Sequence, residues 1–317
     1  MEMRHDAGID VMLLSAEEAL RLDRRAIPPR TDVVRVAAPP RETWGALAER
    51  GFVRKPAWLV WYSDVGAGEE EWLARLSKGV RYDIRRCRRQ AHDELRIELQ
   101  QPIRPETLDR FLEVYESMVA RMRHGVPFAT SLRDAILADE RHWLLYAHST
   151  DGFAGGLVCR EDEETGTVLF RFAAIRPRWR ERSLQKVLYV EATSVARAKG
   201  FRRVSAGNDP NLYGHIAKPG LMTSKARLGF TPYPADPPTG PGSWRDEADL
   251  VIALDRLGDL ALILGYPDGL SGGDEQPFFD LAVYGDPRLG GGIESLPFVR
   301  SVRRHIPCRP AASPAPS

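Results

Sequence analysis

The sequence predicts an α/β protein in which a mixed central sheet is flanked by helices. Three observations lead to this fold class. Short strand-like segments recur between segments of helical periodicity from residue 31 to residue 254. Glycine directly follows three of the expected helices, at Gly51, Gly200 and Gly229, and glycine is common just past helix ends. The composition, with 43% hydrophobic and 28% charged residues, is that of an ordinary globular protein.

The first expected domain, residues 1–68, is a short β/α piece. Residues 1–15 are expected to be frayed or to form a short strand. Beyond them the pattern predicts helices at 16–25 and 41–50 and strands at 31–36 and 57–62. This piece is too short to be a full catalytic domain. We therefore interpret it as the truncated first half of a chain that consists of two halves.

A basic connecting helix is expected within residues 69–93, after a turn at 66–71. Its apolar stripe recurs at helical spacing and consists of Leu76, Val80, Ile84, Cys87 and Ala91. Between Lys78 and Arg89 the other faces carry six Lys or Arg against one Asp. A solvated amphipathic helix explains this pattern. The alternative is an electrostatic dock for RNA, driven by phosphate neutralisation.

The third expected domain, residues 94–255, is a complete α/β domain. Thr150-Asp151-Gly152 predicts a hairpin turn between two of its strands. Residues 206–215 are expected to form a polar loop. The expected strands are 95–99, 142–147, 155–159, 168–175, 201–205 and 249–254, and the expected helices are 105–123, 131–138, 184–199 and 221–228.

The remaining residues, 256–317, form a C-terminal extension. We expect a Gly/Asp-rich loop at 267–277, a strand at 278–284, a helix at 294–305 and a disordered end at 311–317.

Composition restricts the function classes. The net charge is only +1, so any nucleic-acid role depends on a local patch. The three cysteines, Cys87, Cys159 and Cys308, are isolated, which argues against a disulfide framework and a metal site and indicates a reducing cytoplasm. Residues 1–10 lack a signal-peptide core, and no apolar run reaches the roughly 18–20 residues of a membrane span. We therefore expect a cytoplasmic protein without a resident metal.

The order of elements between Leu95 and Leu254 resembles that of GNAT acyltransferases, and Gly229-Phe230 after a short helix is a frequent feature of that family. The basic helix at 77–89 and the polar segment Ala206–Asn211 are similar to those of Fem-type aminoacyltransferases, in which two GNAT-like halves are fused. Leu47–Phe52 faintly repeats Lys225–Phe230. The resemblance covers residues 31–255 and implies a tandem arrangement with an eroded first half.

In GNAT enzymes a turn with the pattern Gln/Arg-x-x-Gly-x-Gly/Ala binds the pyrophosphate of coenzyme A at a helix N-terminus. The matching segment here runs from Arg180 to Gln185, with Ser183 and Gln185 in place of the glycines. The resemblance therefore implies acyl-CoA or acetyl-CoA as co-substrate. Its expected contacts are Arg178, Arg180, Arg182, Ser183 and Lys225.

The expected chemistry is assigned to the polar loop. Asp209 or His215 would remove a proton from an attacking amine, and Tyr213 would protonate the leaving group. Asn208, Asn211, Lys218 and, after a helix end, His124 would contact the acceptor. Turn formation alone also explains Asn208 to Asn211.

These expectations give one leading function and two alternatives. The leading function is transfer of an acyl group from acyl-CoA to an amine of a small molecule or peptide. The first alternative is Fem-type aminoacyl transfer from charged tRNA, bound through the helix Lys78–Arg89. The second is a GNAT-shaped binding protein without catalytic activity.

Overall fold

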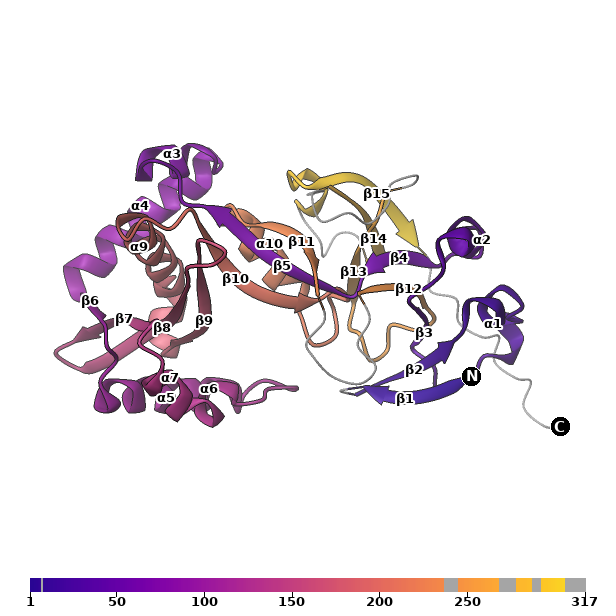
Figure 1. Ribbon diagram of the computed structural model, residues 1–317, viewed down its shortest axis with the longest axis horizontal. Helices are drawn as coiled ribbons and strands as arrows, with labels where there is room; N and C mark the ends of the chain where they lie inside the picture. Colours follow the sequence, from indigo (N-terminus) through magenta and orange to yellow (C-terminus); the bar gives the residue numbers. More distant parts are fainter. Residues whose placement is uncertain (7, 237–244, 268–277, 287–291, 306–317) are drawn as a thin grey trace. The chain divides into compact units, whose positions relative to one another are not determined.

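The computed structural model describes residues 1–6, 8–236, 245–267, 278–286 and 292–305. The chain divides into two compact units (Figure 1). The first comprises Met1–Val60, Asn208–Ala226 and residues from 231 onward, and the second comprises Trp61–Gly207 and Arg227–Phe230. Both units combine strands and helices, which confirms the predicted mixed α/β class. The division into an eroded and a complete GNAT-like half at residues 68, 93 and 255 stays a prediction.

The second unit is built on a mixed sheet with the strand order β5-β10-β9-β8-β7-β6. Neighbours from β6 to β9 are antiparallel, whereas β9 and β10 are parallel. The predicted hairpin is confirmed, because Ser149 pairs with Gly152 across a two-residue turn. The strands are β5 (Trp58–Asp64), β6 (Arg96–Gln100), β7 (His142–Ser149), β8 (Gly152–Asp162), β9 (Thr167–Ile175) and β10 (Arg203–Pro210), of which β5 and β10 contribute residues to both units.

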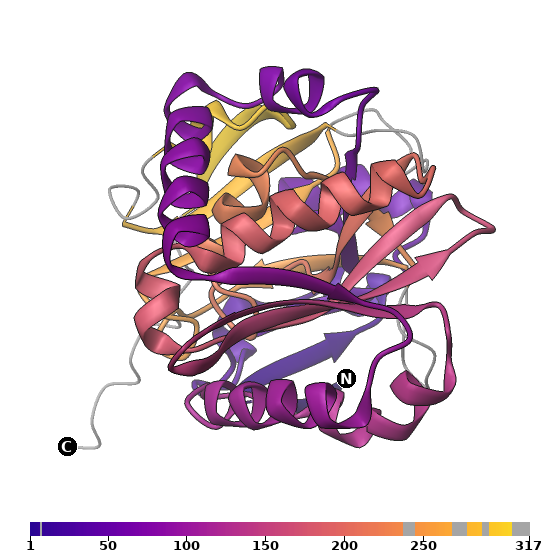
Figure 2. The same cartoon turned by 90° about the vertical axis from the view of Figure 1, so that its left-hand side faces the viewer.

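Helices cover both faces of this sheet (Figure 2): α5 packs on one face, and α9 with α4 beside it packs on the other. The predicted helix at 105–123 ends early, at Val119. The predicted helix at 131–138 forms as α7 from Arg133 to Ala138, after a separate short helix, α6. The helices are α3 (Glu69–Ala74), α4 (Lys78–Glu94), α5 (Pro105–Val119), α6 (Phe128–Ser131), α7 (Arg133–Ala138), α8 (Pro177–Glu181) and α9 (Leu184–Ala198).

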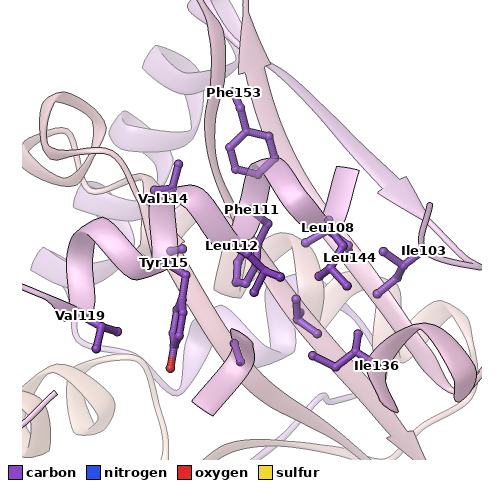
Figure 3. Close-up of a cluster of buried hydrophobic side chains, with 13 residues drawn as sticks. Ile103, Leu108, Phe111, Leu112, Val114, Tyr115, Val119, Ile136, Leu144 and Phe153 are labelled. Carbon is purple, nitrogen blue, oxygen red and sulfur yellow. The ribbon is translucent and has the colours of Figure 1, made fainter. Parts of the chain in front are cut away.

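The core under α5 is aromatic and aliphatic (Figure 3). Phe111 of α5 is fully buried with Leu144 of β7 in one hydrophobic cluster. Tyr115 stacks on Phe111 with ring centroids 6.0 Å apart and meets Phe172 of β9 edge-on at 5.7 Å. Such ring pairs add about 0.5–1.5 kcal/mol each beyond the burial of apolar area. This packing fixes the C-terminal half of α5 against the end of β9.

The first unit contains two sheets. The five-stranded sheet has the order β1-β2-β3-β12-β4, and the three-stranded sheet has the order β13-β14-β15. Helices α1 and α2 pack on one face of the larger sheet. The elements are β1 (Glu2–Asp6), β2 (Ile9–Leu14), α1 (Ala16–Leu20), β3 (Val33–Ala37), α2 (Trp44–Glu49), β4 (Val53–Pro56), α10 (Pro219–Arg227), β11 (Thr231–Ala235), β12 (Asp246–Val251), β13 (Leu260–Gly265), β14 (Phe279–Gly285) and β15 (Val299–His305).

The predicted helix at 294–305 is wrong. The chain there forms one 3-10 turn, Ile293–Ser295, and then β15, which pairs in parallel with β14. Pro297 interrupts any helix at this point, and β14 offers a hydrogen-bonding edge to a neighbouring strand. Strand β13 and the β1–β2 hairpin were not predicted from the sequence. Its expected disordered end and nearly all of its loop at 267–277 lie outside the described residues.

Candidate functional site

The expected phosphate-binding turn follows β9 in the second unit. Helix α8 occupies Pro177–Glu181, and Ser183 is the N-cap residue of α9. The backbone of Ser183 is left-handed, with a φ of 61°, and its side chain makes no capping hydrogen bond. This conformation strongly favours glycine. The turn therefore keeps a glycine-type backbone at the position where the family pattern has glycine, although the residue is serine.

An open cavity of about 420 Å³ adjoins this turn. Its lining comes from α5 and the residues after it, from the end of β9 and from α8. The polar lining residues are Glu113, Ser117, Arg121, Arg176, Arg180 and Glu181. Among them, Arg176 donates from Nε to the carbonyl oxygen of Phe153 at 2.6 Å. The cavity thus joins three guanidinium groups, which suit phosphate, to two carboxylates.

The three arginines predicted to bind the donor phosphates, Arg178, Arg180 and Arg182, make different contacts. Arg180 is exposed and lines the cavity. Arg178 lies 3.3 Å from Asp151, and Arg182 forms an ion pair with Glu94. The guanidinium groups of Arg178 and Arg182 also lie over the ring of the buried Trp179, at 5.1 and 5.2 Å from its centroid. Of the three, Arg180 alone belongs to the cavity.

The polar segment from residue 206 begins as a strand and not as the predicted loop, because β10 continues to Pro210. Asp209 is 4% exposed and accepts hydrogen bonds on both carboxylate oxygens. Lys225 Nζ of α10 lies 2.8 Å from Oδ1, and the Tyr213 hydroxyl donates to Oδ2 at 3.1 Å. The structure therefore joins two predicted catalytic residues and one predicted donor-binding residue in a single buried cluster of the first unit.

Burial lowers the pKa of Lys225, and the carboxylate of Asp209 opposes this effect. Lys225 is only 6% exposed and Tyr213 is 0% exposed. Because its ammonium group is directed at Asp209, Lys225 holds α10 to the end of β10 within the first unit. Its predicted contact with the donor phosphate has no support in this geometry.

Asn211 is fully buried, and its side chain binds backbone. The amide nitrogen donates to the carbonyl oxygens of Pro56 and Leu264 at 3.0 and 2.8 Å, and the amide oxygen accepts from the N–H of Leu264 at 3.0 Å. The residue therefore ties β13 to the end of β4. This structural role leaves no support for the predicted contact with the acceptor.

The other predicted residues are scattered. His215 is 5% exposed and lines a cavity of about 380 Å³ in the first unit. Asn208 and Lys218 are exposed, and Lys218 Nζ lies 3.4 Å from the carbonyl oxygen of Gly214. His124 is half-buried in the second unit, two residues after Met122 of the 420 Å³ cavity. Their catalytic and acceptor-binding roles stay predictions.

Helix α4 has the predicted apolar stripe, with Ile84, Cys87 and Ala91 buried, but many of its charges are paired. Arg85 binds Glu70, and Arg86 binds Asp83. Arg88 reaches both Glu69 and Glu191, each at 2.6 Å. These carboxylates cancel much of the positive field that an RNA-binding helix needs.

Sequence reasoning missed Glu113, Arg121 and Arg176 as cavity residues. These residues come together only in the folded chain, because α5 and the end of β9 are about 60 residues apart in the sequence. Among the described helices, none combines the length and apolar character that crossing a bilayer requires. Within the same residues, no group of three or more His, Cys, Asp or Glu is placed to hold a metal ion.

Residues 78–213 match the family model of the acetyltransferase (GNAT) domain. This segment is therefore a GNAT-type domain, in agreement with the resemblance that the sequence predicted. The match covers α4 through β10, which includes the turn at Ser183 and the cavity beside it. A search of curated proteins found no match.

Several solved structures resemble this chain at low identity. FemX is 10% identical with a TM-score of 0.46, and the alignment covers 70% of this chain and 73% of FemX. L-PGS from Bacillus licheniformis is 12% identical with a TM-score of 0.36, covering 56% and 53%. A tandem GNAT protein from the clavulanic acid biosynthesis pathway is 13% identical with a TM-score of 0.36, covering 70% and 65%.

Proposed function

We propose that this protein is an N-acyltransferase whose second unit binds an acyl-CoA at the N-terminus of α9. The observation that carries the proposal is the left-handed backbone at Ser183, placed at the start of a helix within the matched GNAT domain. The first N–H groups of a helix have no partner within the helix, and the helix dipole favours an anion there. The pyrophosphate of the donor would occupy this end of α9.

The neighbouring cavity supports the same proposal. Arg180 and Arg176 lie in its lining and would bind the phosphates that the substituted glycines hold less well. Arg178 and Arg182 are committed to carboxylates and to Trp179, so we assign them to the turn's structure. The proposal thus narrows the expected phosphate contacts to Arg180, Arg176 and the backbone of α9.

The proposed reaction is direct attack of an amine on the thioester carbonyl. The amine must first lose a proton, because an ammonium has no free electron pair. Glu113 and Glu181 line the cavity and offer carboxylates that accept this proton. The new C–N bond forms, the C–S bond breaks, and coenzyme A leaves as the thiolate.

Calorimetric titration with coenzyme A and acetyl-CoA tests the donor site. We expect saturable binding by the full chain, weakened about tenfold or more in Arg180→Ala, since a charge-assisted hydrogen bond contributes roughly 1.5–3 kcal/mol. Arg178→Ala is the matched control, because Arg178 lies on the same helix, is exposed and does not line the cavity. Absence of binding, or equal loss in both variants, would overturn the donor assignment.

Turnover is tested separately, by release of free thiol from acetyl-CoA in the presence of primary amines. If acetyl-CoA binds but no tested amine leads to release of free thiol, the result would favour the non-catalytic alternative. For the tRNA alternative, the paired charges of α4 predict that triple reversal of Arg81, Arg85 and Arg88 changes RNA binding little. A strong, salt-dependent loss of charged-tRNA binding in that variant would instead support Fem-type transfer.

A further inference from the structure

One face of the five-stranded sheet in the first unit breaks its own hydrophobic pattern. Strand alternation places Val33 of β3 and Val251 of β12 on this face, where both pack into an apolar cluster. The same alternation places Arg35, Glu247 and Asp249 on this face, farther along β3 and β12. Lys55 of β4 joins them through its pairing with Glu247 in the register. Charges at such inward positions mark places where function overrides local pattern.

The four charges form a cross-strand ladder. Arg35 Nε lies 2.7 Å from Asp249 Oδ1, and Lys55 Nζ lies 2.7 Å from Glu247 Oε2. Two diagonal contacts complete the ladder: Lys55 Nζ is 3.3 Å from Asp249 Oδ2, and Arg35 is 3.3 Å from Glu247. Lys55 is 1% exposed and Asp249 is 0% exposed. Cations and anions therefore alternate across three neighbouring strands.

Burying such a ladder of charges carries a large cost in free energy for the sheet. Removing four charges from water carries a large desolvation cost, and apolar side chains of similar volume often stabilise a fold as well or better. The opposite face of the same strands shows that alternative, because Val34, Val36, Ala248 and Leu250 pack there under α1 and α2. Stability alone therefore does not account for the charged ladder.

The ladder borders a cavity of about 380 Å³, within the size range of small-molecule sites. Arg35, Lys55 and Glu247 contribute to its lining from the sheet, and Arg4 and Asp6 contribute from β1. The apolar part of the lining comes from Trp58, Ile9, Val11 and Leu13, and His215 also lines the cavity. The lining thus offers both signs of charge beside an apolar surface.

We propose that this cavity binds a free α-amino acid with an apolar side chain, as the zwitterion. Its carboxylate would contact the Lys55 and Arg35 end of the ladder, and its ammonium group would contact Glu247. Each of these three residues would exchange part of an existing ion pair for the ligand, so no charge is left uncompensated. The apolar side chain would lie against Trp58 and the β2 residues.

This site is separate from the proposed donor site, since every lining residue belongs to the first unit. Binding requires neither an acyl donor nor turnover, so failure of one proposal leaves the other standing. A single anion, such as phosphate, fits the lining less well, because Glu247 and Asp6 would repel it.

The test is calorimetric titration of the full chain with the free L-amino acids at neutral pH. We expect saturable binding of at least one apolar amino acid. The N-acetyl and the carboxamide derivatives of that amino acid should each bind about tenfold more weakly or worse, because each lacks one of the two charges. No binding at millimolar concentration, or equal binding of the blocked derivatives, would overturn the proposal.

Two variants locate the site. Glu247→Gln keeps the size of the side chain and should weaken binding about tenfold, a change of about 1.4 kcal/mol. The double variant Lys55→Met/Glu247→Leu replaces one ion pair by apolar groups, which buried positions tolerate, and should abolish binding while the melting temperature is retained. Arg54→Met is the matched control, since Arg54 neighbours Lys55 on β4 but lies over the Trp44 ring. Unchanged binding in Glu247→Gln, or loss in Arg54→Met alone, would also overturn the proposal.

Discussion

Lys225 Nζ lies 2.8 Å from Oδ1 of Asp209, and this buried ion pair joins α10 to the end of β10. The Tyr213 hydroxyl donates to the other oxygen of the same carboxylate. Asp209 therefore has both oxygens occupied by partners that are themselves buried.

The first prediction concerns this pair. Lys225→Met leaves the Asp209 carboxylate buried with Tyr213 as its remaining partner in the cluster. We expect a loss of about 3–5 kcal/mol in the free energy of unfolding, the usual cost of removing one member of a buried ion pair. Urea denaturation followed by circular dichroism measures it.

The double variant Lys225→Met/Asp209→Leu is the control, because it removes the uncompensated charge together with its partner. Its stability should lie closer to that of the unmodified protein than Lys225→Met does. A single-variant loss below about 1 kcal/mol would contradict a buried, tightly coupled pair.

The sequence allowed much of the fold to be predicted, because most of its elements carry local signals. The stripe of α4 follows from residue spacing, and Gly51 and Gly200 end their helices with φ angles of 89° and 84°. Strands β7 to β9 follow from their apolar runs and from the turn at Thr150-Asp151. The error at 294–305 has a physical cause, since β15 is specified by pairing with β14 and not by its own pattern.

The candidate site was less accessible to sequence reasoning. Polar residues between 206 and 215 indicated a loop, yet Asn211 binds backbone from Pro56 and Leu264. Arg35 and Asp249 are 214 residues apart in the sequence, so no local pattern joins them. Two inward-facing charges on separate strands look like ordinary exposed residues until their strands are paired.

The second prediction tests the backbone at Ser183. A left-handed conformation costs a residue with a Cβ atom roughly 1–2 kcal/mol, and glycine avoids this cost. Ser183→Gly should therefore raise the free energy of unfolding by up to about 1 kcal/mol, after the extra flexibility of glycine in the unfolded chain is subtracted. It should also tighten coenzyme A binding, because the phosphate approaches a barer helix N-terminus.

Ser183→Ala is the matched variant for that experiment. It removes the hydroxyl group but keeps the Cβ atom, so the backbone strain stays. We expect neither the gain in stability nor the gain in affinity. If the alanine and glycine variants behave alike, the strain argument at this turn does not hold.

The third prediction concerns acid stability and the charged ladder. Burial raises the pKa of Asp249, but the charges of Arg35 and Lys55 more than offset burial, so the net pKa is lowered. A carboxyl with a lowered pKa in the folded state stabilises the fold above its unfolded pKa, about 3.9, and loses that contribution as the pH falls. The melting temperature should therefore drop as the pH falls below about 4.

Arg35→Met isolates the contribution of the ladder. Without the guanidinium group the pKa of Asp249 in the folded state rises. The difference between its pKa values in the folded and unfolded states therefore shrinks. We expect a shallower acid decline in the variant than in the unmodified protein, although its stability at neutral pH is lower. Parallel declines, measured by thermal unfolding from neutral pH to acid, would show that other carboxyl groups dominate.

The fourth prediction separates the structural and RNA-binding interpretations of α4. Arg88 is 30% exposed and lies 2.6 Å from both Glu69 and Glu191, whereas its neighbour Arg89 is exposed. Arg88→Gln should cost about 1 kcal/mol in the free energy of unfolding, a value kept small because water partly screens the pair. Arg89→Gln should stay within about 0.5 kcal/mol of the unmodified protein.

The two α4 variants remove the same charge from the same helix, so RNA affinity provides the second measurement. If α4 docks RNA through its net charge, Arg89→Gln should weaken binding at least as much as Arg88→Gln, because the exposed charge contacts phosphate more freely. We expect instead that neither variant changes the salt dependence of RNA binding, since Glu69, Glu70 and Glu191 cancel much of the positive field of the helix. A reduced salt slope in Arg89→Gln with unchanged stability would reverse this conclusion.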